Sequence, residues 1–274
     1  MSKVRYTGGE PLVRNDILEL VEGAVRTEGI RTVHLTTNGM LLPALAEPLR
    51  RVGLHGVNIS LDTLDPERFS KCTRRTGLEQ VLTGLEAVLA LRFPSVKVNV
   101  VAMRGFNDDE MSAFVELTRE APITVRFIEL MPFDASQIWR TGRFLGMERM
   151  LAGFTQLYPQ CEVVDGSSTE HMTFRVPGCA GSVAFIPSYT RDFCNDCTRI
   201  RLTADGRIRN CLYSEEEFGI LGHLRQGGTD GDITQTLKDA MWAKPEDGRA
   251  AQQQASTRQG PDGRIRESMA QIGG

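Results

Sequence analysis

The sequence has few features that would place the protein in a membrane or in an export pathway. It contains no apolar run near the roughly 18–20 residues that a membrane-spanning helix needs. Its first residues, "MSKVRYTGGEP", have neither the apolar core of a secretory signal nor the Arg- and Ser-rich pattern of a transit peptide. We therefore expect an intracellular protein.

An excess of positive charge is also missing. The formal net charge is −3 at pH 7, which argues against a general affinity for nucleic acids or acidic membranes. Hydrophobic residues make up 41% of the sequence and charged residues 24%, which is ordinary for a globular protein. The 274 residues are enough for one large domain or two smaller ones. A basic ligand pocket is compatible with this mildly acidic composition.

Cysteine is scarce and unevenly placed. The sequence has six cysteines, and none precedes Cys72. Cys72, Cys161 and Cys179 are scattered, and we expect them to be buried thiols because reduced cysteine packs like a small apolar residue. The other three form a C-x2-C-x13-C array within "DFCNDCTRIRLTADGRIRNC", which favours metal binding over disulfides in a reducing compartment. They are Cys194, Cys197 and Cys211.

Three neighbouring cysteines leave the identity of the metal open. Structural zinc needs a fourth ligand, which His171 or His223 could supply by folding back. A [4Fe–4S] cluster can be held by three thiolates, with its fourth iron open to a small ligand. Arg199 and Arg201 alternate on a predicted strand and would project the same way, which suits an anion such as a polyphosphate. They could equally be solvated or salt-bridged arginines.

The first half of the sequence alternates between strand and helix patterns. Five short strands separated by amphipathic helices predict a parallel sheet with right-handed crossovers. The predicted strands are "KVRYTGG", "TVHLTTNG", "GVNISLDT", "VKVNVVA" and "ITVRFIEL". The helix predicted after the third strand carries an apolar stripe of Leu78, Val81, Leu82, Leu85, Val88 and Leu89, and Asp108 and Asp109 are predicted to open the helix before the fifth strand. Polar or glycine-rich segments follow four of them, and barrel enzymes place their sites at such carboxyl ends. These segments, which we expect to share one site, are Thr7–Glu10, Thr36–Gly39, Ser60–Thr63 and Glu129–Pro132.

The pattern changes after about Pro132. "TFRVPGCAGSVAFI" predicts a β-hairpin around Pro177–Gly181, and "TADGRI" predicts a hairpin turn inside the cysteine array. The tail from about Gly227 is polar and weakly helical, and "RAAQQQAS" predicts a solvated linker or a frayed helix. We therefore predict a partial barrel over residues 1–132 and a C-terminal subdomain over residues 133–274.

The segments "VRYTGGEPLVR", "LTTNG", "NISLDTLD", "VKVNVV" and "RFIELMPF" precede the cysteine array, and "IGG" ends the chain. In this order and spacing, the sequence resembles the GTP 3′,8-cyclase family. Its members are radical S-adenosylmethionine (SAM) enzymes of molybdenum cofactor biosynthesis. The resemblance implies an α/β fold, an incomplete TIM-like barrel of parallel strands with a C-terminal iron–sulfur subdomain. It also implies a lyase that converts GTP to 3′,8-cyclo-7,8-dihydro-GTP by SAM-derived radical chemistry.

The resemblance further implies roles for individual residues. A [4Fe–4S] cluster would be held by Cys194, Cys197 and Cys211, with GTP at its open iron. The residues that would bind GTP are Arg5, Thr36, Lys97, Arg199, Ile200 and Arg201. SAM would contact Gly9, Ser60 and Met131. The terminal Gly273 and Gly274 would reach into the active site.

The family holds a further [4Fe–4S] cluster, which cleaves SAM, on a C-x3-C-x2-C motif that these residues do not contain. We expect a truncated piece of a complete enzyme, inactive on its own. The alternatives are a natural isoform acting as a non-catalytic GTP-binding [4Fe–4S] protein or interaction subunit, and a chain completed by a separate polypeptide. The family implies cyclic pyranopterin monophosphate synthase as the downstream partner, a homodimer, and a location in the bacterial cytoplasm or the mitochondrial matrix.

Overall fold

The computed structural model describes residues 1–131, 142–166, 172–189 and 197–255. By its internal contacts the chain divides into two compact units. The first unit comprises Met1–Pro132 and Gln137–Thr190, and the second comprises Phe133–Ser136 and Arg191–Gly274. No helix in the described ranges is both long and apolar enough to cross a membrane.

The first unit is built on one eight-stranded sheet, in the order β1-β2-β3-β4-β5-β8-β7-β6. Its strands are β1 (Lys3–Tyr6), β2 (Thr32–Thr37), β3 (Gly56–Ser60), β4 (Ser95–Ala102), β5 (Thr124–Glu129), β6 (Glu162–Val164), β7 (Met172–Arg175) and β8 (Ser182–Ile186). Strands β1 to β5 and β8 run parallel, whereas β7 is antiparallel to β8 and β6 to β7. The predicted fold class, an α/β incomplete TIM-like barrel with a mostly parallel sheet, is confirmed.

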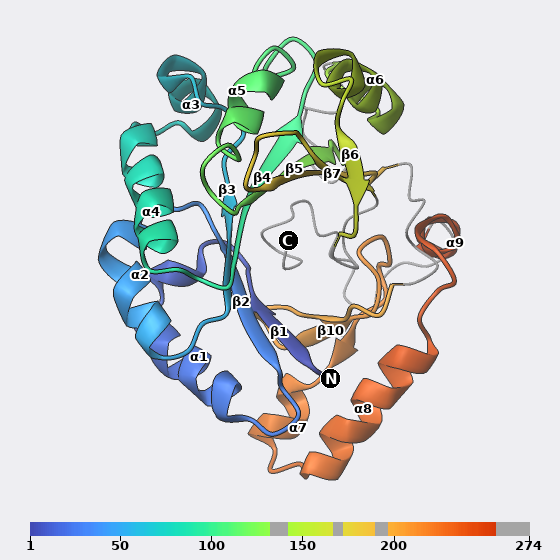
Figure 1. Ribbon diagram of the computed structural model, residues 1–274. Coiled ribbons are helices and arrows are strands. Elements are labelled where there is room, and N and C mark those ends of the chain that lie inside the picture. The colour runs from blue at the N-terminus through green and yellow to red at the C-terminus, as the bar shows by residue number, and fades with distance from the viewer. Residues whose placement is uncertain (132–141, 167–171, 190–196, 256–274) are drawn as a thin grey trace. The chain divides into compact units, whose positions relative to one another are not determined.

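Helices lie along the outer side of this sheet (Figure 1). They are η1 (Pro11–Val13), α1 (Ile17–Arg26), α2 (Leu42–Arg51), α3 (Pro66–Thr73), α4 (Leu78–Ala90), α5 (Met111–Glu116) and α6 (Met147–Leu157). The apolar stripe predicted after the third strand is buried in α4, where Leu78, Val81, Leu85 and Val88 are at most 6% exposed. The helical periodicity of the sequence therefore located the face that packs into the core.

Side-chain contacts shift the start of α5 from its predicted place. The sequence predicts that Asp108 and Asp109 open this helix, but it begins at Met111. The Asp108 carboxylate accepts a hydrogen bond from the Gly105 N–H at 2.8 Å, and Asp109 pairs with Arg68 at 2.6 Å. Neither carboxylate caps the helix, because each already holds a partner elsewhere.

The two faces of the sheet differ in character. Along β4, Val96, Val98 and Val100 are buried, and Lys97 and Asn99 alternate with them on the opposite face. The apolar face packs against the helices and belongs to the core of the first unit. The opposite face is therefore available for polar side chains.

The β-hairpin predicted around Pro177–Gly181 is confirmed, because β7 and β8 are antiparallel neighbours. Through β8 the hairpin joins the first sheet, where it runs parallel to β5. Gly181 allows this close approach, since a Cβ atom there would meet the Ile123 carbonyl oxygen at 2.3 Å. The domain boundary between residues 132 and 133 stays a prediction.

The second unit has a three-stranded antiparallel sheet, in the order β11-β10-β9, and three helices among its described residues. Its elements are β9 (Arg201–Leu202), β10 (Arg207–Arg209), β11 (Phe218–Gly219), α7 (Leu221–Arg225), α8 (Asp230–Trp242) and α9 (Gly248–Ala255). The predicted "TADGRI" turn joins β9 to β10, with Gly206 at φ +74°. A small apolar cluster of Ile208, Ile220 and Ala240 forms a core.

The C-terminal region is more regular than its composition predicts. Helix α8 begins with a capping box, in which the Thr229 hydroxyl accepts from the Asp232 N–H and the Asp232 carboxylate accepts from the Thr229 N–H. The segment predicted as a linker or frayed helix forms α9, in which Ala251 is buried. Local capping and one buried alanine thus give order to a polar sequence.

Candidate functional site

The first sheet gathers polar side chains from β1 to β5 on one face, which we call the polar face. In the parallel register Arg5 lies beside His34, and Thr36, Asn58 and Lys97 lie at one level on β2, β3 and β4. Residues two apart on a strand share a face, so Arg5 is on the same side as this row. The structure therefore brings three predicted GTP-binding residues, Arg5, Thr36 and Lys97, onto one surface.

A second polar row lies one level nearer the carboxyl ends of the strands. Ser60, Asn99 and Arg126 are register neighbours on β3, β4 and β5. The Arg126 Nε donates to the Asn99 Oδ1 at 2.8 Å, and the Arg126 side chain is buried. Ser60, a predicted SAM contact, is exposed at the end of its strand.

Asn58 holds an unsatisfied acceptor in the middle of the polar face. This residue is 1% exposed, and its Nδ2 donates to the Thr36 Oγ1 at 3.2 Å. Its Oδ1 is buried and has no hydrogen-bond partner among the described atoms. A buried carbonyl oxygen without a donor is destabilising, so the atom fits a ligand that brings an N–H or O–H group.

Positive charge is concentrated around His34. Burial lowers the pKa of His34 to about 3, helped by the charges of Lys3, Arg5, His55 and Lys97. The imidazole is therefore neutral at physiological pH and adds no further positive charge beside these cations. Such a surface suits an anionic ligand.

Two turns at the carboxyl ends of β1 and β2 are tied together by Glu10. Its Oε1 accepts from the Thr37 hydroxyl at 2.8 Å, and its Oε2 accepts from the Asn38 N–H at 2.7 Å. Gly9, a predicted SAM contact, lies exposed beside Glu10, after Gly8 at φ +109°. Two of the four polar segments predicted to share a site are thus joined directly.

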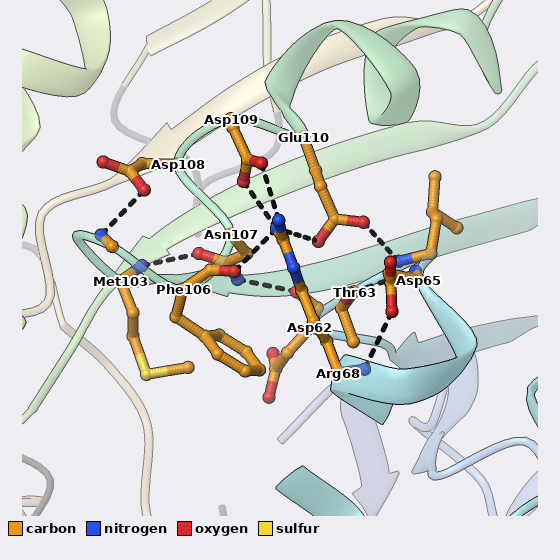
Figure 2. A network of polar contacts seen from close by, with 12 residues as sticks. Asp62, Thr63, Asp65, Arg68, Met103, Phe106, Asn107, Asp108, Asp109 and Glu110 are labelled. Atoms are coloured by element: carbon orange, nitrogen blue, oxygen red, sulfur yellow. Dashed lines mark hydrogen bonds and ion pairs between the residues drawn. The ribbon is translucent and has the colours of Figure 1, made fainter. Parts of the chain in front are cut away.

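Figure 2 shows how the loops after β3 and β4 are held together. The Asn107 Nδ2 donates to the backbone oxygens of Asp62 at 2.6 Å and Val101 at 2.9 Å, and its Oδ1 accepts from the Met103 N–H at 2.8 Å. Burial raises the pKa of Asp62 to about 6, although a hydrogen bond from the Val101 N–H opposes that rise. These contacts fix the end of β3 only two residues beyond Ser60.

Glu129 fixes the end of β5. It is fully buried, and its two carboxylate oxygens accept from the N–H groups of Met147 and Tyr189, each at 2.8 Å. Met131, the third predicted SAM contact, follows two residues later and is half-buried. The structure thus places Gly9, Ser60 and Met131 beyond or at the ends of parallel strands.

The second unit contains two of the three array cysteines within the described residues. Cys197 and Cys211 are half-buried free thiols, and both act electrostatically on Arg201. Burial raises the pKa of Cys197, but the backbone hydrogen bond at Arg199 and the charges of Arg199 and Lys244 bring it below its usual value. This environment favours the thiolate, the form of cysteine that binds iron or zinc.

Arg201 shares that environment. Burial and the charge of Arg199 lower its pKa to about 10, while Cys197 and Cys211 oppose the shift. The guanidinium therefore stays positively charged at physiological pH. Arg201 thus keeps the charge that an anionic ligand would require, and Ile200 beside it is half-buried.

Several predictions about cysteine and the chain end have different outcomes. Cys194, Gly273 and Gly274 lie outside the described residues. Within the described ranges, no three His, Cys, Asp or Glu side chains are grouped so as to hold a metal ion. The prediction that Cys72 is buried is wrong: it is exposed on α3, whose only buried residue is Phe69. Cys179 is buried as predicted, whereas Cys161 is only half-buried.

The sequence analysis missed four residues of the polar face. They are His34, Asn58, Asn99 and Arg126. The available signal was the alternation of polar and apolar residues inside the strands, as in "SVKVNVVA". Polar residues were expected only at the strand ends, because a strand of a parallel sheet is usually apolar on both faces.

The sequence matches two family descriptions. They are "Radical SAM superfamily" over residues 1–118 and "Molybdenum Cofactor Synthesis C" over residues 123–250. A protein of Chlorobaculum tepidum named GTP 3′,8-cyclase is 46% identical over 272 residues, covering 99% of this chain and 80% of that protein. A protein of Alkaliphilus oremlandii with the same name is 42% identical over 246 residues, covering 90% of this chain and 75% of that protein.

A longer relative is also similar. Molybdenum cofactor biosynthesis protein 1 of Homo sapiens is 40% identical over 245 residues, which cover 89% of this chain but 38% of that protein. The matches extend over both units, and the two bacterial relatives carry the same name. The chain belongs to the GTP 3′,8-cyclase family of radical SAM enzymes in molybdenum cofactor biosynthesis.

Proposed function

We propose that this chain binds GTP and contributes to its conversion to 3′,8-cyclo-7,8-dihydro-GTP. The observation that carries the proposal is the polar face, where Thr36, Asn58 and Lys97 lie at one level on neighbouring strands. Lys97 and Arg5 offer cations for the triphosphate. The Asn58 Oδ1 offers an acceptor to a hydroxyl or N–H of the nucleoside.

Arg199, Ile200 and Arg201 of the second unit are proposed as further GTP-binding residues. Their support is the family resemblance, together with the positive charge that Arg201 keeps beside Cys197 and Cys211. Cys194, Cys197 and Cys211 are proposed to hold a [4Fe–4S] cluster. When bound, such a cluster supplies an iron with an open coordination position for the substrate.

SAM is proposed to bind at the carboxyl ends of the strands of the first unit. Gly9 would leave backbone accessible to the methionine moiety, Ser60 would offer a hydroxyl, and Met131 a soft apolar contact. The turn that bears Gly9 is held by Glu10, and the end of β3 is held by Asn107. These supports keep the proposed contacts in place without taking part in chemistry.

The 274 residues contain no C-x3-C-x2-C motif, so we propose that this chain by itself binds GTP without cleaving SAM. In a cell, cyclic pyranopterin monophosphate synthase would take the cyclised product onward. After anaerobic reconstitution we expect about four irons per chain, as one cluster requires, and no 5′-deoxyadenosine from SAM under reducing conditions. About eight irons, or measurable 5′-deoxyadenosine, would contradict the proposed inactivity.

The GTP assignment is tested by one matched pair of variants. Lys97→Met should weaken GTP binding about tenfold or more in calorimetric titration, because a charge-assisted hydrogen bond to phosphate is lost. Lys71→Met makes the same charge change at an exposed residue of α3 and should leave the affinity unchanged. Equal affinities of Lys97→Met and the unmodified chain would refute GTP binding on the polar face.

A further inference from the structure

Lys244 joins the two segments of the second unit that carry the described cysteines. Its Nζ donates to the carbonyl oxygen of Arg199 at 3.0 Å and also to the carbonyl oxygen of Asn210. Arg199 stands two residues after Cys197, and Asn210 immediately precedes Cys211. One ammonium group therefore links the backbone next to one cysteine with the backbone next to the other.

Helix α8 fixes the position of Lys244. The helix ends at Trp242, and the backbone N–H of Lys244 still donates to the Met241 carbonyl at 3.3 Å. Ala240, in the last turn, is fully buried against Ile208 of β10. A cation just beyond a helix C-terminus is also favoured by the negative end of the helix dipole.

A second contact strengthens the same connection. The Asn210 Nδ2 donates to the Ala240 carbonyl oxygen at 2.9 Å, and Asn210 is fully buried. The segment before Cys211 is thus attached to α8 through the Asn210 side chain and to Lys244 through the Asn210 carbonyl oxygen. The segment after Cys197 is attached to Lys244 through the Arg199 carbonyl oxygen.

Lys244 also brings a positive charge to the array. Its Nζ is hydrogen-bonded to the carbonyl oxygens of Arg199 and Asn210, which stand two residues after Cys197 and one residue before Cys211. An ammonium has three N–H donors, and the described contacts of Lys244 use two of them. Hydrogen bonds and nearby charge set both the retention and the reduction potential of an iron–sulfur cluster.

We infer that Lys244 is a positioning residue for the metal centre: it sets the separation of the Cys197 and Cys211 segments and offsets the negative charge of a thiolate-bound cluster. The inference rests on the proposed role of Cys194, Cys197 and Cys211 as cluster ligands. A purely structural role would instead confine the effect of Lys244 to the folding of α8.

The test uses the full chain, reconstituted anaerobically with iron and sulfide, as wild type, Lys244→Met, Lys244→Arg and Lys238→Met. Lys238 is an exposed lysine on α8, the helix that precedes Lys244, so Lys238→Met matches the charge change without the carbonyl contacts. Iron content, the rate of iron loss to a ferrous chelator and the reduction potential are measured, and circular dichroism follows folding of each apo-protein.

We expect Lys244→Met to lose iron about 10–100-fold faster and to be reduced at a more negative potential than wild type. Lys244→Arg should retain iron better than Lys244→Met, and Lys238→Met should match wild type. If Lys244→Met keeps the iron-loss rate and potential of wild type, the inference is overturned. The inference is also overturned if the Lys244→Met apo-protein loses enough helix to account for its faster loss of iron. If wild type itself forms no iron–sulfur cluster, the proposed function of the cysteines has failed first.

Discussion

The two units position their candidate binding residues by different means. In the first, Thr36, Asn58 and Lys97 are set by backbone register between neighbouring strands over a large apolar core. In the second, the apolar core among the described residues consists of Ile208, Ile220 and Ala240, with two partly buried side chains beside it. There, single side chains such as Lys244 and Asn210 hold the cysteine segments through backbone carbonyl oxygens.

This difference implies that the two units depend on a bound metal to different degrees. A sheet with a large core forms its binding face before any ligand arrives. Short strands with a small core gain much of their order from the metal, because the free energy of metal binding is also free energy of folding. The second unit is therefore expected to be the more sensitive to loss of the proposed cluster.

The largest expected effect follows from removal of the metal. In the reconstituted chain, Cys211→Ser should abolish the iron–sulfur absorption and raise amide hydrogen exchange in β10 and α8 about tenfold or more. Exchange in β3 and β4 should stay as in wild type. Equal exchange in β10 and α8 with and without the cluster would show that the second unit is ordered independently of metal.

A smaller but still large effect on the free energy of unfolding is expected from a substitution in the core of the first unit. Phe154 is fully buried, and its ring lies 5.3 Å, centroid to centroid, from each of Tyr158, Phe174 and Phe185. Phe154→Ala should reduce the free energy of unfolding by about 3–5 kcal/mol, because it leaves a cavity among these rings.

Denaturant unfolding followed by hydrogen exchange checks this prediction. Phe154→Leu serves as the control, since it keeps most of the volume and should cost less. A loss of protection confined to the first unit would support separate stabilities for the two units. Loss of protection in both would show that they unfold together.

The smallest effect is a pH dependence that belongs to the first unit alone. Burial raises the pKa of Asp62 from 3.8 to about 6, so its folded form favours the proton. Its contribution to stability is therefore full below pH 3.8 and is lost as the pH rises through about 6. Asp62→Asn removes this titration and keeps an oxygen that can accept from the Val101 N–H.

Relative to wild type, Asp62→Asn should gain about 2–3 kcal/mol of unfolding free energy between pH 4 and pH 7. The measurement is the difference between the two denaturant stability curves across this range. A difference that is constant with pH would show that Asp62 is ionised in the folded protein as readily as in the unfolded chain. Hydrogen exchange in the second unit should be the same in both proteins.

The sequence was most informative where structure is local. The apolar periodicity of α4 and the Pro177–Gly181 hairpin could be recognised from neighbouring residues. The start of α5 could not, because Asp108 and Asp109 bind partners that the helical pattern does not reveal. The burial of Cys72 was predicted wrongly for a similar reason, because the exposure of a helical residue depends on which distant segments pack over that helix.

By itself, the sequence determined the alternation of strands and helices, the spacing of Cys194, Cys197 and Cys211, and the motifs that the family shares. Only the tertiary structure decided that Asn58 lies between Thr36 and Lys97, and that Lys244 binds the carbonyl oxygens of Arg199 and Asn210. The physical reason is that periodicity and capping act over a few residues. Strand register and helix docking instead select partners that lie far apart along the chain.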